Sequence, residues 1–259
     1  MCEIVGYRDN YEKKYMNSIV NSSRMNKIIV PILFTVLFTA GLLLAGVLSK
    51  KLNFAVSENS YINGQFNYQL ILLFITGISI FTTFLLNQNN FSNFFSWGQL
   101  SAAGDELKFF GIKKGDSWVK TGLSLSLFIT VVTAIFMYFQ LKQVNINWSV
   151  LQAGIVWIVL FSLTNSFGEE MIFRLGIVSP LKGLLAPITI FWISAILFGI
   201  PHFAGMPNGI IGATLAGVLG FVLAKSMYET NGFFWAWLIH FLQDVVIIGS
   251  MYLISAASR

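Results

Sequence analysis

The chain has 259 residues, of which 56% are hydrophobic and only 10% are charged, and its mean hydropathy is +0.72. These values lie far from those of soluble globular proteins and indicate a polytopic membrane protein. The net charge of +5 does not indicate nucleic-acid binding, because the basic residues cluster at the edges of apolar segments, where they set membrane orientation. The single cysteine, Cys2, excludes a disulfide within the chain.

The polar residues 1–27 predict a cytosolic tail ahead of the first membrane helix. We see no cleavable signal peptide, because the first apolar segment already has full membrane length. The apolar segments that follow are each long enough to cross about 30 Å of hydrocarbon at about 1.5 Å per residue. We expect crossings near residues 28–48, 68–87, 121–141, 153–180, 186–203, 208–226 and 232–256.

The apolar stretch from Gly183 to Ala224 is too long for one crossing. Gly and Pro residues between His202 and Gly209 interrupt it, and both residue types turn chains efficiently. The sequence therefore predicts an all-α bundle of about seven to eight membrane helices, with one membrane domain over residues 28–259.

Basic residues are unevenly distributed between the loops. The expected first external loop carries only Lys50 and Lys51. The tail and the second loop carry many more: Arg8, Lys13, Lys14, Arg24, Lys27, Lys108, Lys113, Lys114 and Lys120. By the positive-inside rule, the tail and the second loop are expected on the cytoplasmic side. Residues 87–116 of that loop are partly amphipathic and fit either a segment on the membrane surface or a solvated loop.

Two adjacent acids lie in the fourth apolar segment. Glu170 and Arg174 are spaced i and i+4, so they can pair on one helix face and offset each other's burial cost. Glu169 points about 100° away and is left without that cation. Desolvation makes such a carboxylate a stronger base for water. The alternative is that Glu169 caps a helix end or faces a water-filled loop.

Both histidines of the chain also lie in apolar segments. His240 and Asp244 are spaced i and i+4, as are Phe198 and His202. Either histidine alone could be a packing residue, but ionisable groups at bilayer depth are functional suspects. The depths of Glu169, His202 and His240 differ by up to about 12 Å, which helix tilt and a kink can partly close. This requires the fourth helix to continue past Arg174 to residue 180.

The three motifs have a recognisable order. It reads Glu-Glu-x-x-x-Arg at residues 169–174, Phe-x-x-x-His at 198–202 and His-x-x-x-Asp at 240–244. This order resembles the CPBP family, also called Abi, which comprises CAAX-type prenyl-protein endopeptidases and bacteriocin-processing or self-immunity membrane proteins. The resemblance covers roughly residues 120–256, the expected catalytic core.

The resemblance implies an intramembrane endopeptidase in which Glu169 is the general base for water and His240 is its partner. It makes His202 an oxyanion donor and Asp244 the fourth member, with a supporting set of Glu170, Arg174 and Phe198. The family has Asn or Asp at the last position, and an ionised Asp cannot donate a hydrogen bond to an oxyanion. Asp244 is therefore either protonated or orients His240.

The question of a metal follows from the residue types. Glu169, His202 and His240 could bind zinc and leave one position for water, and the family was first classed with the metalloproteases. Against zinc, these ligands would come from three separate helices without a compact His-x-x-x-His pair. We therefore expect metal-free hydrolysis by glutamate-activated water and no cofactor.

Two other classes stay open at this stage. A non-catalytic immunity or abortive-infection protein could use the same fold, and a proton-coupled transporter could use the same residue types, although it predicts inverted repeats and we find none. The expected partners are the lipid bilayer and a membrane-associated peptide, either a prenylated C-terminus or a leader peptide, and no nucleic acid. A bacterial plasma membrane suits the long apolar segments at least as well as an endoplasmic reticulum.

Overall fold

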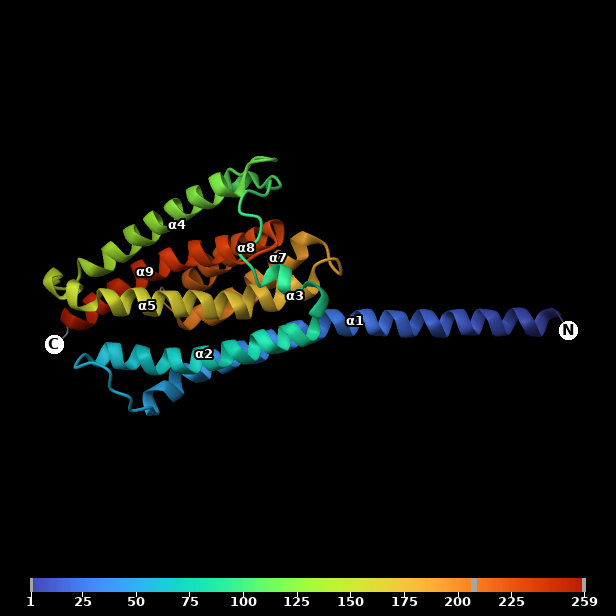
Figure 1. The fold of residues 1–259 in the computed structure, drawn as a ribbon, viewed down its shortest axis with the longest axis horizontal. Helices are drawn as coiled ribbons and strands as arrows, with labels where there is room; N and C mark the ends of the chain where they lie inside the picture. Colours follow the sequence, from blue (N-terminus) through green and yellow to red (C-terminus); the bar gives the residue numbers. More distant parts are fainter. Residues whose placement is uncertain (1, 206–208, 258–259) are drawn as a thin grey trace.

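The computed structural model describes residues 2–205 and 209–257, with side chains from Ser22 onward. This described part contains no β-strand, only isolated β-bridges in loops. Figure 1 shows its α-helices, which are α1 (Cys2–Leu48), α2 (Ser60–Leu86), α3 (Gln88–Phe94), α4 (Trp118–Leu141), α5 (Leu151–Glu170), α6 (Gly176–Leu181), α7 (Pro187–Gly199), α8 (Gly209–Thr230) and α9 (Phe234–Ala257).

Seven helical segments of the described chain are long and apolar enough to cross a membrane. They are residues 22–51, 60–86, 118–141, 148–181, 187–204, 209–230 and 234–257. Their outer faces expose large hydrophobic side chains such as Phe74, Val156 and Ile210, which suit contact with lipid. The all-α membrane fold class is confirmed, and so is the expected number of crossings.

The first two helices begin earlier than hydropathy predicts. The boundary expected at residue 27 lies inside α1, which is one continuous helix from Cys2, because a polar stretch can continue a helix beyond the membrane. Helix α2 begins at Ser60 rather than near residue 68. Its start is set by Asn59, whose side chain accepts a hydrogen bond from the Tyr61 backbone N–H and caps the helix.

The fourth crossing is a single helical run with one irregular turn. Helix α5 ends at Glu170, the π-helical turn η4 (Met171–Leu175) follows, and α6 (Gly176–Leu181) completes the run. The expected continuation past Arg174 is confirmed. A π-helical turn changes the rotation of the residues that follow it and is frequent at functional sites.

The predicted break between the fifth and sixth crossings is present in the described residues. Helix α7 passes into the 3₁₀ turn η5 (Ile200–Ala204), and α8 begins at Gly209, whose φ of 72° is readily adopted only by glycine. Residues 206–208 of the predicted break lie outside the described residues. Close packing of the two helices requires Gly199, since a Cβ there would lie 2.7 Å from the Ala213 carbonyl oxygen.

Helix α9 is the centre of the bundle. Helices α4 and α5 both pack along α9, and α7 pairs with α8 (Figure 1). Helix α2 lies on α5, and α1 packs against α2 and α6. This arrangement places the acids at the end of α5 against the first half of α9. It therefore brings the first and third sequence motifs together.

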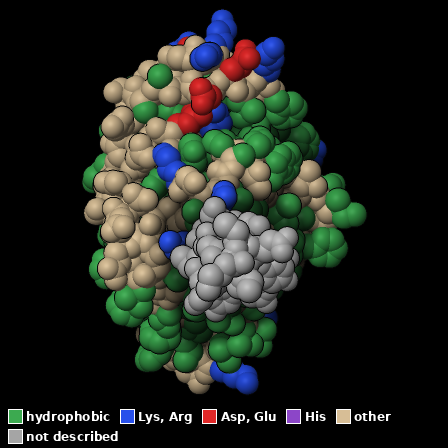
Figure 2. Space-filling model, turned by 90° about the vertical axis from the view of Figure 1, so that its right-hand side faces the viewer, with side chains coloured by type: hydrophobic (Ala, Val, Ile, Leu, Met, Phe, Trp, Pro, Cys, Tyr) green, Lys and Arg blue, Asp and Glu red, His purple; other side chains and the backbone are tan. Residues whose placement is uncertain are grey.

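The loop between α3 and α4 is attached to the α8–α9 hairpin. The backbone N–H of Gln99 donates to the Thr230 carbonyl over 2.7 Å, and the indole N–H of Trp235 donates to the Leu100 carbonyl over 2.9 Å. Figure 2 shows that acidic and basic side chains gather at the edge of the molecule that this loop occupies. The loop is therefore a fixed part of the fold at this end of the bundle.

Candidate active site

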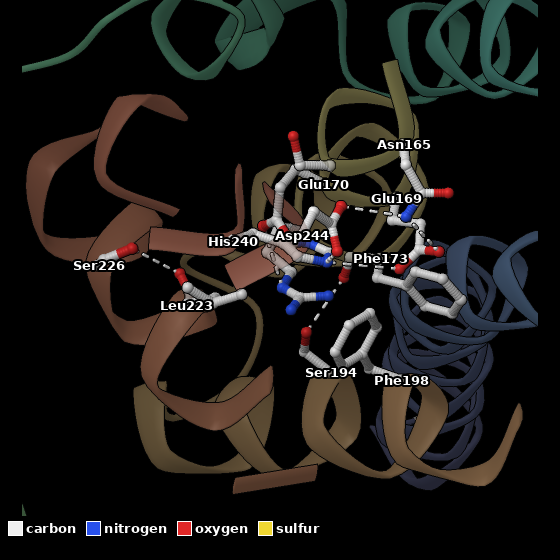
Figure 3. Close-up of polar contacts among 12 residues, drawn as sticks. Asn165, Glu169, Glu170, Phe173, Ser194, Phe198, Leu223, Ser226, His240 and Asp244 are labelled. Carbon is white, nitrogen blue, oxygen red and sulfur yellow. Dashed lines mark hydrogen bonds and ion pairs between the residues drawn. The ribbon is translucent and has the colours of Figure 1, made fainter. Parts of the chain in front are cut away.

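Glu170 and His240 form a short polar contact at the centre of the site (Figure 3). Oε1 of Glu170 lies 2.8 Å from Nδ1 of His240, and Oε2 of Glu170 lies 3.1 Å from Nε of Arg174. The Glu170 and Arg174 side chains are fully buried, and His240 is nearly so. Because a carboxylate oxygen accepts, the proton of a neutral His240 ring lies on Nδ1, and Nε2 faces the other acids. The pairing of Glu170 with Arg174 is as the spacing predicts, but its contact with His240 is additional.

Glu169 lies on the other side of the imidazole ring. Its Oε2 is 3.7 Å from His240 Nε2 and has no hydrogen-bond partner among the described residues, although the atom is buried. Its Oε1 accepts a hydrogen bond of 3.2 Å from Asn165. Two atoms 3.7 Å apart can both hydrogen-bond to one water molecule placed beside them. Glu169 Oε2 and His240 Nε2 are therefore placed so that one water molecule could bond to both.

Asp244 lies close to the same imidazole nitrogen. Its Oδ1 is 3.6 Å from His240 Nε2, and its Oδ2 accepts a hydrogen bond of 3.1 Å from Asn165 Nδ2. The Asn165 amide thus links Asp244 to Glu169. Sequence reasoning missed Asn165, although its i, i+4 spacing from Glu169 was a signal that could have identified it.

His202 is next to the cluster but bonds to its own helix. Its Nδ1 lies 2.7 Å from the Phe198 carbonyl oxygen, which can only accept, so Nδ1 carries a proton. The Phe198 ring lies between the two histidines, with its centroid 4.5 Å from that of His202 and 5.6 Å from that of His240. The Arg174 guanidinium carbon lies 4.0 Å from the centroid of the same ring. Phe198 therefore contacts three of the predicted site residues.

A close helix contact fixes the position of Glu169. A Cβ at its neighbour Gly168 would lie 2.8 Å from Thr76 Oγ1 and 3.0 Å from the Leu72 side chain. Only glycine therefore allows α5 to approach α2 this closely. This contact sets the position of Glu169, and the π-helical turn that follows Glu170 changes the rotation of Arg174 relative to the two acids.

The residues that could bind zinc do not lie together as a ligand set in the described part of the chain. Across residues 22–205 and 209–257, no three His, Cys, Asp or Glu side chains are grouped so that they could hold a metal ion. The proposed ligands Glu169, His202 and His240 do not form such a set.

The fold and this cluster define a class: a polytopic helical membrane protein with acids and histidines buried between its membrane helices. Residues 150–246 match the family described as type II CAAX prenyl endopeptidase Rce1-like, and that stretch contains every predicted site residue. This match is to part of the chain, and it confirms the resemblance to CAAX-type proteases drawn from the three motifs. No curated protein and no solved structure matches the chain.

Proposed function

We propose that the protein is an intramembrane endopeptidase in which Glu169 and His240 activate a water molecule to cleave a peptide bond. The observation that carries this proposal is the buried Oε2 of Glu169, which faces His240 Nε2 at 3.7 Å without a hydrogen-bond donor. A buried acceptor without a partner costs about 1–3 kcal/mol, so proteins rarely keep one without a reason. A reacting water supplies the missing donor.

The proposed reaction uses each member of the cluster. Glu169 takes a proton from the water, whose oxygen attacks the carbonyl carbon of the substrate, and the proton then passes to the nitrogen of the breaking C–N bond. Glu170 holds the His240 ring through Nδ1 and leaves Nε2 directed at the water. His202 has Nδ1 engaged by the Phe198 carbonyl oxygen, so its Nε2 can donate to the oxyanion only when that nitrogen also carries a proton.

The proposed substrate is a membrane-associated peptide. The family description names prenyl endopeptidases, which favours a prenylated CAAX-type C-terminus, and a bacteriocin or other leader peptide is the second substrate to test. We propose a cytoplasmic N-terminus on the strength of the basic residues in the tail and in the loop before α4, and a bacterial plasma membrane as the location that suits the long apolar segments.

The direct test compares purified wild type with Glu169→Ala and His240→Ala. Each is incubated with a prenylated CAAX peptide and a panel of leader peptides, and products are identified by mass spectrometry. We expect the wild type to cleave and both variants to lose cleavage, while Glu106→Ala, which removes an exposed loop carboxylate, cleaves as the wild type does. Cleavage that survives both site substitutions would overturn the mechanism.

We also propose that hydrolysis needs no metal. The support is the tight engagement of His240 Nδ1 by Glu170 and of His202 Nδ1 by its own helix, together with the absence of a metal-holding group of side chains in the described part of the chain. Activity should persist in a strong chelator, and elemental analysis of the active protein should find less than about one zinc per ten chains. Loss of activity on chelation, restored by zinc, would contradict this.

A further inference from the structure

Asn165 contacts two acids of the site, Glu169 and Asp244. It is on α5, one helical turn before Glu169, and its Nδ2 lies 3.2 Å from Glu169 Oε1 and 3.1 Å from Asp244 Oδ2. Figure 3 shows the amide nitrogen directed toward these carboxyl groups. One amide group therefore joins a side chain of α5 to a side chain of α9.

Glu169 and Asp244, which Asn165 joins, need a hydrogen-bond donor between them. Glu169 Oε2 and Asp244 Oδ1 both approach His240 Nε2, at 3.7 and 3.6 Å, so two carboxyl groups share one side of a buried ring. Carboxylates this close repel each other in a buried site unless a donor lies between them. Glu170 has Arg174 and His240 Nδ1 for this purpose. Among the described residues, Asn165 donates a hydrogen bond to both Glu169 and Asp244.

A neutral donor suits this position better than a charged one. A lysine or arginine here would stabilise the ionised form of Glu169 by a full charge and weaken it as a base for water. A primary amide has two N–H groups, one for each carboxyl group, and carries no charge. An aspartate here would instead add another acceptor to a site that already holds three acids.

We propose that Asn165 is a positioning residue that holds Glu169 and Asp244 together beside His240 Nε2. This assigns Asp244 the part of a second anchored acid, kept in place through Asn165, rather than that of an oxyanion donor. The proposal rests on the proposed function, since it concerns the geometry of the same reaction.

The test measures kcat and KM for cleavage of the peptide that the wild type cuts. Asn165→Leu, which has nearly the same size but no donor, should lower kcat by about 10- to 100-fold and change KM less than about twofold. Asn165→Asp should lower kcat further because it adds an acceptor. Asn165→Gln keeps the amide on a longer side chain and should retain more activity than Asn165→Leu.

The matched control is Ser166→Ala on the next residue of α5. Ser166 is buried, but its hydroxyl donates to the Ser162 carbonyl of its own helix over 2.6 Å, so its loss should leave kcat unchanged. The melting temperature of each variant in the same detergent shows whether it is folded.

The outcomes separate this proposal from the one it rests on. A folded Asn165→Leu variant with wild-type kcat, or one whose loss is entirely in KM, overturns the positioning role and leaves the proposed peptidase intact. Equal loss in Asn165→Gln and Asn165→Leu also overturns it, because the amide then has no part. A wild type that cleaves none of the peptides overturns the proposed function and this inference together.

Discussion

The protein buries acidic side chains in two places, and they are satisfied to very different degrees. Near the end of α8, Glu229 accepts hydrogen bonds from Lys225, from the Trp118 indole N–H at 2.8 Å and from the Asp105 backbone N–H at 3.2 Å. At the α5–α9 contact, Glu169 keeps one buried oxygen without a donor. Both acids are mostly buried, with side-chain exposures of 8% for Glu229 and 12% for Glu169.

Under the proposed function, this difference separates an acid that stabilises the fold from one that takes part in the reaction. Glu229 joins α8 to α4 and to the loop before it, and its donors leave it no free role. Glu169 retains a buried oxygen that has no hydrogen-bond donor among the described residues and lies 3.7 Å from His240 Nε2. Because buried polar groups are normally paired, this oxygen supports the proposed role of Glu169 in the reaction.

The largest effect is expected from a substitution of His240, which lies beside Glu169 in the proposed active site. His240→Ala should reduce kcat by about 10⁴-fold, the upper range for a general acid or base. It should also lower stability by about 1–3 kcal/mol, because Glu170 Oε1 loses its donor. Peptide cleavage and chemical unfolding in mixed micelles measure the two effects. A variant with more than about a tenth of wild-type kcat would contradict the role of His240.

The next largest effect is expected at Glu229, the buried acid that has several hydrogen-bond donors. Glu229→Leu leaves Lys225 buried without an anion and removes the acceptor of Trp118, so we expect about 3–5 kcal/mol of destabilisation. Unfolding in mixed micelles gives this value. Glu106→Leu is the matched control, since Glu106 is an exposed carboxylate 3.9 Å from an exposed lysine and should change stability little. Equal stabilities for the two variants would show that Glu229 is not a structural anchor.

A smaller effect is expected at Arg174, which both stabilises the fold and supports the proposed active site. Its guanidinium pairs with Glu170 and lies 4.0 Å from the Phe198 centroid. Arg174→Lys keeps the charge but loses the planar contact, so we expect a loss of about 1–2 kcal/mol, while Arg174→Met should cost more because it leaves Glu170 without a cation. Lys142→Met, which removes an exposed cation 4.6 Å from the Phe139 centroid, should have almost no effect. Stability equal to wild type in Arg174→Met would argue against the buried pair.

The smallest effect lies outside the membrane segments, at Asp116. The Lys120 ammonium and then the Lys113 backbone N–H hold the pKa of this half-buried carboxyl below its ordinary value of 3.8. Because the pKa is lower in the folded chain, the contribution to stability is present above pH 3.8 and is lost as the pH falls through the folded pKa. Asp116→Asn should lower the melting temperature by at most about 1 °C at pH 7, and the difference should shrink toward pH 3. A difference that grows on acidification would reverse this sign.

Much of the fold could be predicted because membrane crossings depend on local hydropathy. The seven crossings, the break after His202 and the continuation past Arg174 are all present in the described residues. Helix starts were predicted less well, since Asn59 starts α2 by capping rather than by hydropathy. The sequence cannot predict such a start from the apolar pattern alone.

The site could be predicted only in part, because its contacts depend on how α5 and α9 are rotated. The i, i+4 spacing predicts the pairing of Glu170 with Arg174. It does not predict the bond from Glu170 to His240, which depends on how α5 packs against α2 and α9. The link from Asn165 to Asp244 joins residues 79 positions apart, so it too depends on the helix packing. The catalytic roles themselves stay predictions until activity is measured.

The most direct test of the account applies one substitution to each acid. Glu169→Gln and Glu229→Gln both replace a mostly buried carboxyl with an amide and are compared with the wild type for kcat on the cleaved peptide and for melting temperature. We predict that Glu169→Gln loses at least about 10²-fold in kcat and melts at or above the wild-type temperature, while Glu229→Gln keeps its kcat and melts lower. Wild-type kcat in Glu169→Gln would contradict the claim that this carboxylate activates water.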